Sequence, residues 1–262
     1  MILLWRTLAD FRRRTLGWAV VASVFAIGYA RIYSDLRSSG LLVESRTPAM
    51  QDLIDTVERA PMAGYLETTV YGLMPPLLVV LCAVGLGARA VAGLEETGEL
   101  ELLLAGPIGR RRLVLTRYAG LVVSVTLIGL IIWASVQWFV FAGRIRIDAV
   151  DVAAACAGVV LVGLFFGSMA FAAGAFTGDR TVALTLTGTL VTVAYSLRAL
   201  ADTADETRAM RWLSPFQYHL GGEGPHPLWP GGYELLLILL TGGLLTAAVY
   251  GFGRRDVGTE AA

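Results

Sequence analysis

Charged residues are scarce in this chain of 262 residues. Asp, Glu, Lys and Arg together make up 16% of it, whereas about 25% is usual in a soluble domain. Hydrophobic residues make up 56%, and the mean hydropathy is +0.65. The formal net charge is zero, so that no overall field attracts nucleic acid. This composition predicts a membrane protein and gives no reason to expect nucleic acid as a partner.

Residues suited to catalysis or metal binding are also few. The two cysteines, Cys82 and Cys156, lie in apolar runs, where we expect small buried side chains rather than a disulfide or a metal site. The two histidines, His219 and His226, have no neighbouring Cys or paired carboxylates and make a poor metal site. No nucleophile with a base and no pair of acids is evident. We therefore expect no catalytic residue, metal or cofactor in this chain.

Lysine is absent altogether, and so is a G-x-x-x-x-G-K-[ST] phosphate loop. All 21 basic residues are arginines, which we attribute to compositional bias rather than to function. No segment between the apolar runs is long enough to fold a nucleotide-binding domain. Any nucleotide hydrolysis would depend on another polypeptide.

Apolar runs dominate what is present. A helix needs roughly 20 mostly apolar residues to cross the hydrocarbon core of a bilayer. Six stretches qualify, at residues 16–33, 68–92, 113–142, 152–176, 181–200 and 233–252. Residues 1–15 place Leu4, Leu8 and Phe11 on one helical face, which indicates an interfacial helix; a cytoplasmic first turn with snorkelling arginines is the alternative. We expect one all-α, polytopic transmembrane domain over residues 1–262.

The arginines predict the orientation of the helices. With the N-terminus inside, twelve of the 21 arginines fall on cytoplasmic segments, the side on which basic residues are enriched. Both termini of this multi-pass chain would then lie on the cytoplasmic side of the cytoplasmic (inner) membrane. The long segments at 34–67 and 201–232 would be extracellular. Aromatic residues of the second, such as Phe216, suit an interfacial belt.

One polar segment, residues 94–112, reads LEETGELELLLAGPIGRRR and has four acids at one end and three arginines at the other. Residues 94–104 are expected to form one short helix with Leu100, Leu103 and Leu104 on the same side. Gly106 and Pro107 should end it, because proline and the residue before it leave the α-helical conformation. The alternative is a loop whose charges are simply solvated.

This order of residues resembles the cytoplasmic loop of ABC-2 type transporter permeases. There, paired acids, a glycine, a Glu-Leu-Leu-Leu run, a small residue before proline and a basic cluster recur in the same order. The six apolar stretches and the Arg254-Arg255-Asp256 ending resemble the same family. The resemblance implies an ABC-2 (type V exporter-like) permease fold with six transmembrane helices and an N-terminal interfacial helix. It also implies an ATP-driven transporter that exports an amphipathic or lipidic substrate or drug; a membrane scaffold or assembly subunit that moves no cargo is the alternative.

The resemblance further implies partners. In the family this loop contains a coupling helix, which docks on a separate ATPase subunit that binds ATP and Mg. Two copies of that ATPase and a second permease, identical or related, would complete the transporter in the lipid bilayer. The implied coupling residues are Glu95, Glu96, Gly98, Glu99, Leu100, Glu101, Leu102, Leu103, Leu104, Pro107, Arg110, Arg111 and Arg112. Glu99 departs from the family pattern, in which a small polar residue is expected.

Polar side chains inside the apolar stretches are candidates for a transport pathway, because such groups usually face the interior of a helix bundle. The candidates are Tyr71, Ser124, Ser135, Gln137, Thr185 and Thr189. Their hydroxyl and amide groups could equally hold helices together.

Glycines and prolines predict two features of helix packing. Gly163, Gly167 and Gly174 are expected to let a neighbouring helix approach closely. Pro75 and Pro76 are expected to kink the second span.

Overall fold

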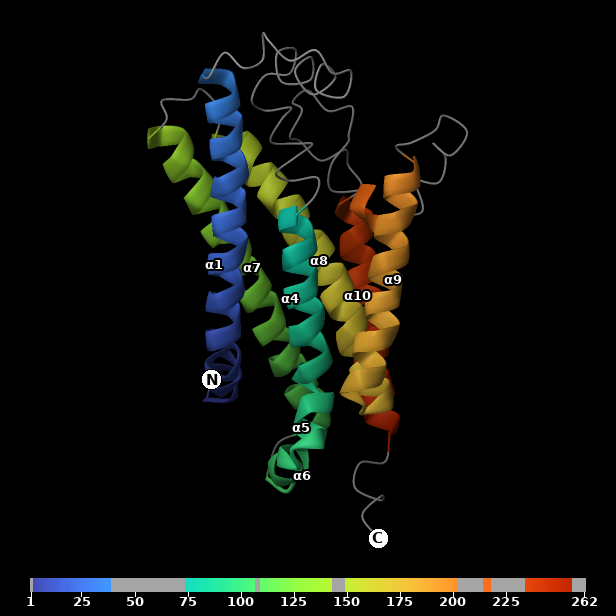
Figure 1. Ribbon diagram of the computed structural model, residues 1–262. Coiled ribbons are helices and arrows are strands. Elements are labelled where there is room, and N and C mark those ends of the chain that lie inside the picture. Colours follow the sequence, from blue (N-terminus) through green and yellow to red (C-terminus); the bar gives the residue numbers. More distant parts are fainter. Residues whose placement is uncertain are drawn as a thin grey trace.

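The computed structural model describes residues 2–38, 74–106, 109–142, 149–201, 214–217 and 234–255 (Figure 1). Every element in these ranges is a helix. In chain order they are α1 (Ile2–Ser38), α4 (Met74–Ala90), α5 (Ala92–Glu96), α6 (Glu99–Leu104), α7 (Arg110–Ala142), α8 (Ala149–Thr177), α9 (Arg180–Ala201), the 3-10 turn η4 (Pro215–Gln217) and α10 (Glu234–Arg254). The described part of the chain therefore confirms the all-α class.

Three helical segments are long and apolar enough to cross a membrane, judged by length and composition. They are Arg110–Ala142, Val152–Thr177 and Glu234–Arg254. A shorter apolar helix covers Pro75–Ala90. The helices α7, α8, α9 and α10 begin and end within three residues of the last four stretches expected from the sequence.

The first helix differs from the expectation. α1 is a single helix of 37 residues, with no break between the interfacial helix expected at 1–15 and the span expected at 16–33. The buried residues on α1 follow a spacing of three or four across that boundary, and they are Thr7, Phe11, Thr15, Ala19, Ala22, Ser23 and Ala26. α1 packs mainly against α7 and also against α4, and its buried stripe continues through the boundary, so nothing separates the two segments. At 1.5 Å per residue, α1 is about 55 Å long, which exceeds the roughly 30 Å of a hydrocarbon core.

The centre of the bundle is the pair α4 and α8, which run in the same direction. A Cβ atom added to Gly167 would lie 3.0 Å from the Cβ of Ala83, and one added to Gly174 would lie 3.4 Å from the carbonyl oxygen of Ala88. Gly163 meets α4 in the same way, one turn before Gly167. The three glycines therefore do allow the close approach expected from the sequence. α8 also packs against α7, α9 and α10, so that it is the most central helix among the described elements.

Pro75 and Pro76 are the second and third residues of α4 as it is described, from Met74 to Ala90. The residues directly before Met74 lie outside the described part of the chain. The kink expected at the two prolines therefore stays a prediction. Residues 68–73, which include the pathway candidate Tyr71, lie outside the described residues.

Most of the two segments expected to be extracellular, 34–67 and 201–232, lies outside the described residues, including both histidines. Within the second segment, the structure describes the 3-10 turn η4. Phe216 is 2% exposed, and its ring packs 5.4 Å from that of Phe166 and 5.7 Å from that of Tyr195. The hydroxyl of Ser214 donates to the Ala194 carbonyl at 2.7 Å. Phe216 is therefore part of the core and not of an interfacial belt, because this turn docks against α8 and α9.

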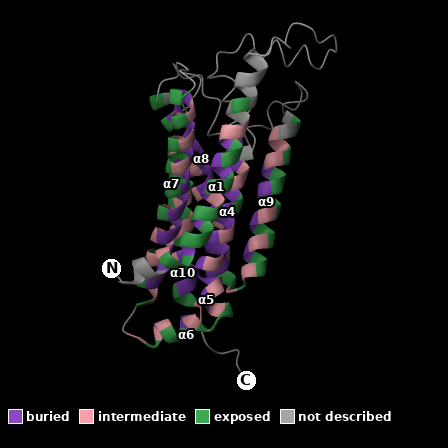
Figure 2. Cartoon of the chain, turned by 60° about the vertical axis from the view of Figure 1, so that its left-hand side comes forward, coloured by how far each residue is buried: buried purple, intermediate pink, exposed green. Residues whose placement is uncertain are grey.

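The beginning of α1 and the end of α10 lie at the same end of the bundle, and α5 and α6 lie there too (Figure 1). Exposed residues lie on the outer faces of the helices (Figure 2). Many of them are large and apolar. Of the three candidate spans, α10 is the least covered, since only 17% of its most apolar window is buried. This surface suits a lipid environment or a second protein chain.

Candidate functional site: the polar end of the bundle

The polar segment forms two short helices where the sequence predicts one over residues 94–104. α5 ends at Glu96, Gly98 adopts a left-handed conformation with φ of 70°, and α6 begins at Glu99. A left-handed residue after a helix is a common terminator, and glycine adopts it without steric cost. Gly98 therefore turns the chain between the two helices. α6 ends at Leu104, before Gly106, as expected; Pro107 lies outside the described residues.

The leucines of α6 divide between two sides. Leu100 is 0% exposed, and Leu103 and Leu104 are partly buried against the same core of the bundle. Leu102 is 78% exposed on the other side. The sequence thus predicts the apolar face correctly. That face covers other helices of the same chain, however, so it is not free to fill a groove in a partner.

The acids of this segment also differ in their surroundings. Glu96 and Glu101 are exposed, whereas Glu99 is half-buried. Glu95 forms a bidentate ion pair with Arg255, in which Nη1 donates to Oε2 at 2.9 Å and Nη2 donates to Oε1 at 2.6 Å. Glu101 precedes Leu102 in α6, and Glu96 is the last residue of α5. We call Glu96, Glu101 and Leu102 the exposed edge of α5 and α6.

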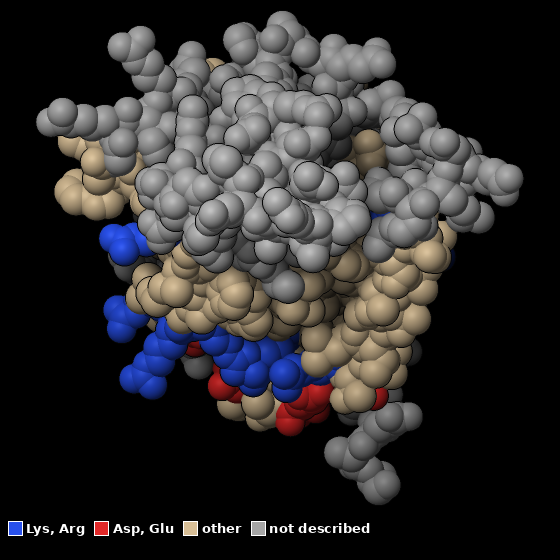
Figure 3. Space-filling model, turned by 45° about the horizontal axis from the view of Figure 1, so that its top comes forward, with Lys and Arg blue, Asp and Glu red and all other residues tan. Residues whose placement is uncertain are grey.

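Basic side chains gather at one end of the molecule, and acidic side chains lie next to them (Figure 3). Arg111 and Arg112 at the start of α7 are exposed. Arg110 is half-buried and donates from Nη1 to the backbone carbonyl of Arg255 at 2.9 Å. The basic cluster thus has an exposed part, suited to lipid head groups, and one member that binds the end of α10.

Sequence reasoning missed two ion pairs at this end. One joins Glu95 to Arg255, 160 residues away. The other joins Asp10 of α1 to Arg117 of α7 at 3.1 Å, although Arg117 is only 3% exposed. No local spacing signals either pair, because the partners come from different helices. Only the charge of Arg117 inside an apolar stretch could have marked it, since a buried arginine needs a partner.

The pathway candidates among the described residues lie in different surroundings. Ser124 is buried, whereas Thr185 and Thr189 are exposed on α9. Ser135 and Gln137 are half-buried near the far end of α7, and the hydroxyl of Ser135 donates to a carbonyl of its own helix at 2.7 Å. Their shared role in a pathway remains a prediction.

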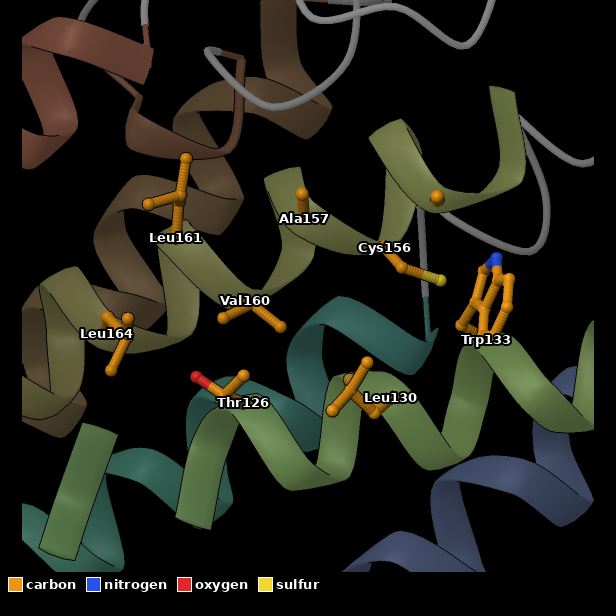
Figure 4. Close-up of a pocket in the computed structure, with 10 residues that line it drawn as sticks. Thr126, Leu130, Trp133, Cys156, Ala157, Val160, Leu161 and Leu164 are labelled. Carbon is orange, nitrogen blue, oxygen red and sulfur yellow. The ribbon is translucent and has the colours of Figure 1, made fainter. Parts of the chain in front are cut away.

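An apolar groove lies between α7 and α8 (Figure 4). Its volume is about 540 Å³, and Trp133 and Cys156 lie at one end of it (Figure 4). The lining residues are Thr126, Gly129, Leu130, Trp133, Ala153, Cys156, Ala157, Val160, Leu161 and Leu164. None of the five pathway candidates that the structure describes lines the groove. Its chemistry suits an apolar chain rather than a polar ligand.

The pattern of a protein family described as ABC-2 family transporter protein matches residues 1–203 of the chain. The match covers α1 to α9, with α5 and α6 inside it, and ends before η4 and α10. The chain therefore belongs to the ABC-2 family of transporter membrane proteins. It is a transmembrane subunit without ATPase activity, and in such transporters ATP binds to a partner ABC ATPase. No curated protein matches the chain closely enough to count as similar.

Proposed function

We propose that this chain is the permease of an ATP-driven exporter whose ATPase docks on the exposed edge of α5 and α6. In this proposal α1, α4, α7, α8, α9 and α10 are the six spans. The end of the bundle that carries α5, α6 and the arginines faces the cytoplasm, and so do both termini. The clustering of arginines at this end supports the orientation, because basic residues are enriched on the cytoplasmic side.

The exposure of Leu102 is the observation that carries the docking proposal. It is 78% exposed, while the other leucines of α6 are at least partly buried. Glu96 and Glu101 are exposed on the same short segment. An apolar side chain beside acids suits a groove with an apolar floor and a basic rim on the ATPase.

A second permease, identical or related, and two ATPase copies complete the proposed transporter. The exposed hydroxyl residues of α9, which include Thr181, Thr185, Thr189 and Thr192, recur every three or four residues and form one row. In the proposed dimer this row lines a pathway between the two permeases. The exposure of Thr185 and Thr189 supports their role in it. Together with the apolar groove between α7 and α8, it supports an amphipathic or lipidic cargo.

Substitution of the exposed leucine tests the docking proposal. Leu102→Asp should weaken the association with the ATPase by about 2 kcal/mol or more, or about 30-fold in affinity, because a charge would face an apolar pocket. Insertion and thermal unfolding of the permease should be unchanged, since the side chain makes no core contact. The measurement is the amount of ATPase that co-purifies with the tagged full-length chain, together with the ATPase rate of the complex.

Two further variants complete this experiment. Gly109→Asp adds the same charge at the same end of the bundle, directly before α7, where an acid caps the helix and an added Cβ meets nothing within 4 Å; it should leave the association intact. Leu100→Asp should destabilise the permease itself, because Leu100 is fully buried in its own core. Wild-type ATPase association and activity in Leu102→Asp would show that the exposed edge is not the docking surface.

A further inference from the structure

Three parts of the chain far apart in sequence meet at Arg255, directly after α10. Its guanidinium forms the bidentate pair with Glu95 of α5. Its backbone carbonyl accepts a hydrogen bond from Arg110 at the start of α7. The side chains of Arg255 and Glu95 are 25% and 27% exposed, so both are largely removed from solvent. Such an arginine–carboxylate fork fixes direction as well as distance, because two parallel hydrogen bonds form.

The turn between α8 and α9 is shaped to accept the same guanidinium. Gly178 has φ of 70°, and the Arg255 guanidinium occupies the space into which a side chain at position 178 would project. Asp179 then starts α9, since its Oδ1 accepts the backbone N–H of Thr181 at 2.6 Å and of Val182 at 3.1 Å. Arg255 therefore lies against a turn whose backbone is held by its own hydrogen bonds.

α10 has little other connection to the polar segment. It packs mainly against α8 and to a smaller extent against α7, whereas α5 packs on α4, α6, α8 and α9. Most of the surface of α10 is exposed. The contacts of Arg255 thus provide a direct connection between α5 and the end of the last helix. We call Glu95, Arg110, Gly178 and Arg255 the Arg255 clasp.

We propose that Arg255 is a positioning residue that makes the α5–α6 segment and the end of α10 move as one body. This inference rests on the proposed docking of α5 and α6. A displacement of the docked segment by the ATPase is then passed to α10 through the guanidinium and to α9 through the Gly178 turn. Glu95 consequently acts within the permease, so it is not part of the docking surface.

Distances between two spin labels test this proposal in the full-length chain. Cysteines replace Ala105 and Gly253, which are exposed at the end of α6 and in the last turn of α10, and Cys82 and Cys156 are changed to alanine. Labelled chains are diluted with unlabelled ones, so that pulsed electron paramagnetic resonance reports the distance within one chain. The chain is measured alone in lipid nanodiscs, and in complex with its ATPase without nucleotide and after ATP–vanadate trapping.

We expect one narrow distance with the wild-type clasp, and the same distance in both states of the complex. Arg255→Gln and Glu95→Gln should each broaden the distribution in the chain alone and make it depend on nucleotide in the complex. Arg255→Lys should be intermediate, because an ammonium keeps the charge but cannot form the fork. Arg254→Gln is the matched control: its guanidinium lies 4.1 Å from the ring centroid of Tyr250, and the distance should stay narrow.

Either of two results would overturn the proposal. One is a narrow, unchanged distance in both Arg255→Gln and Glu95→Gln. The other is a wild-type distance that shifts between the two states of the complex. If Leu102→Asp still binds the ATPase, the docking proposal fails, but the measurement on the chain alone still decides whether the clasp holds α6 to α10.

Discussion

At the scale of single residues, two glycines share a backbone conformation but differ in their neighbours. Gly98 and Gly178 both have φ of 70°. A Cβ atom on Gly98 would meet nothing within 4 Å, whereas one on Gly178 would overlap the Arg255 guanidinium. Substitution of Gly98 would therefore report the cost of a left-handed backbone alone. Substitution of Gly178 would add the cost of displacing the Arg255 guanidinium.

Alanine substitution of these glycines gives a matched comparison. Gly98→Ala should cost about 1–2 kcal/mol, the penalty for a left-handed L-residue. Gly178→Ala should lower the thermal unfolding temperature further, because the Arg255 side chain must also leave its place. Both temperatures are measured on purified chains in the same detergent. Equal losses in the two variants would mean that the guanidinium adds nothing to the stability of the turn.

The leucines and acids of the polar segment show what sequence can predict about this site. The segment itself, its amphipathic character and its end before Gly106 follow from local pattern and are correct. Local pattern does not say what the apolar face meets, so the burial of Leu100 against the permease itself was not foreseen. The ion pair between Glu95 and Arg255 was not foreseen either, because it depends on how α10 packs.

At the scale of helices, the pair α4 and α8 depends on the absence of side chains at its contact. Gly167→Val should lower the unfolding temperature, because its Cβ alone would lie 3.1 Å from the carbonyl oxygen of Ala83, and overpacking of this kind costs about 1–3 kcal/mol. Gly188→Val on α9 is the control, since a Cβ there meets nothing within 4 Å. If both variants unfold at the same temperature, the backbone contact between α4 and α8 is not a main source of stability.

The limits of the helices were predictable to different degrees. α7 to α10 match their apolar stretches closely, because charged or turn residues flank each of them. α1 does not, since Arg12, Arg13 and Arg14 mark the expected depth of a bilayer surface but do not interrupt a helix. Hydropathy thus indicates which part of a helix a membrane could cover, whereas the ends of the helix depend on backbone breakers and on packing.

At the scale of the whole molecule, the alternating direction of the helices predicts which residues each side of the membrane can reach. Single cysteines at Gly109 and Gly253, in a chain without Cys82 and Cys156, should react with a membrane-impermeant maleimide only from the cytoplasmic side. A cysteine at Ala142, at the other end of α7, should react only from outside. All three positions are exposed. If the cysteines at positions 109 and 142 both react from the same side of the membrane, α7 does not span it.

The backbone contact of α4 with α8 also bears on how such a chain can change during evolution. A contact between two side chains can be repacked, because a larger residue on one helix is compensated by a smaller one on the other. Gly167 and Ala83 are already among the smallest residues. A larger residue at either position therefore cannot be compensated by a smaller one at the other. The outer surface of α10, where Leu235, Ile238 and Leu239 are exposed, carries no such constraint. Related chains should therefore diverge first on this exposed surface of α10 and keep small residues where α4 and α8 meet.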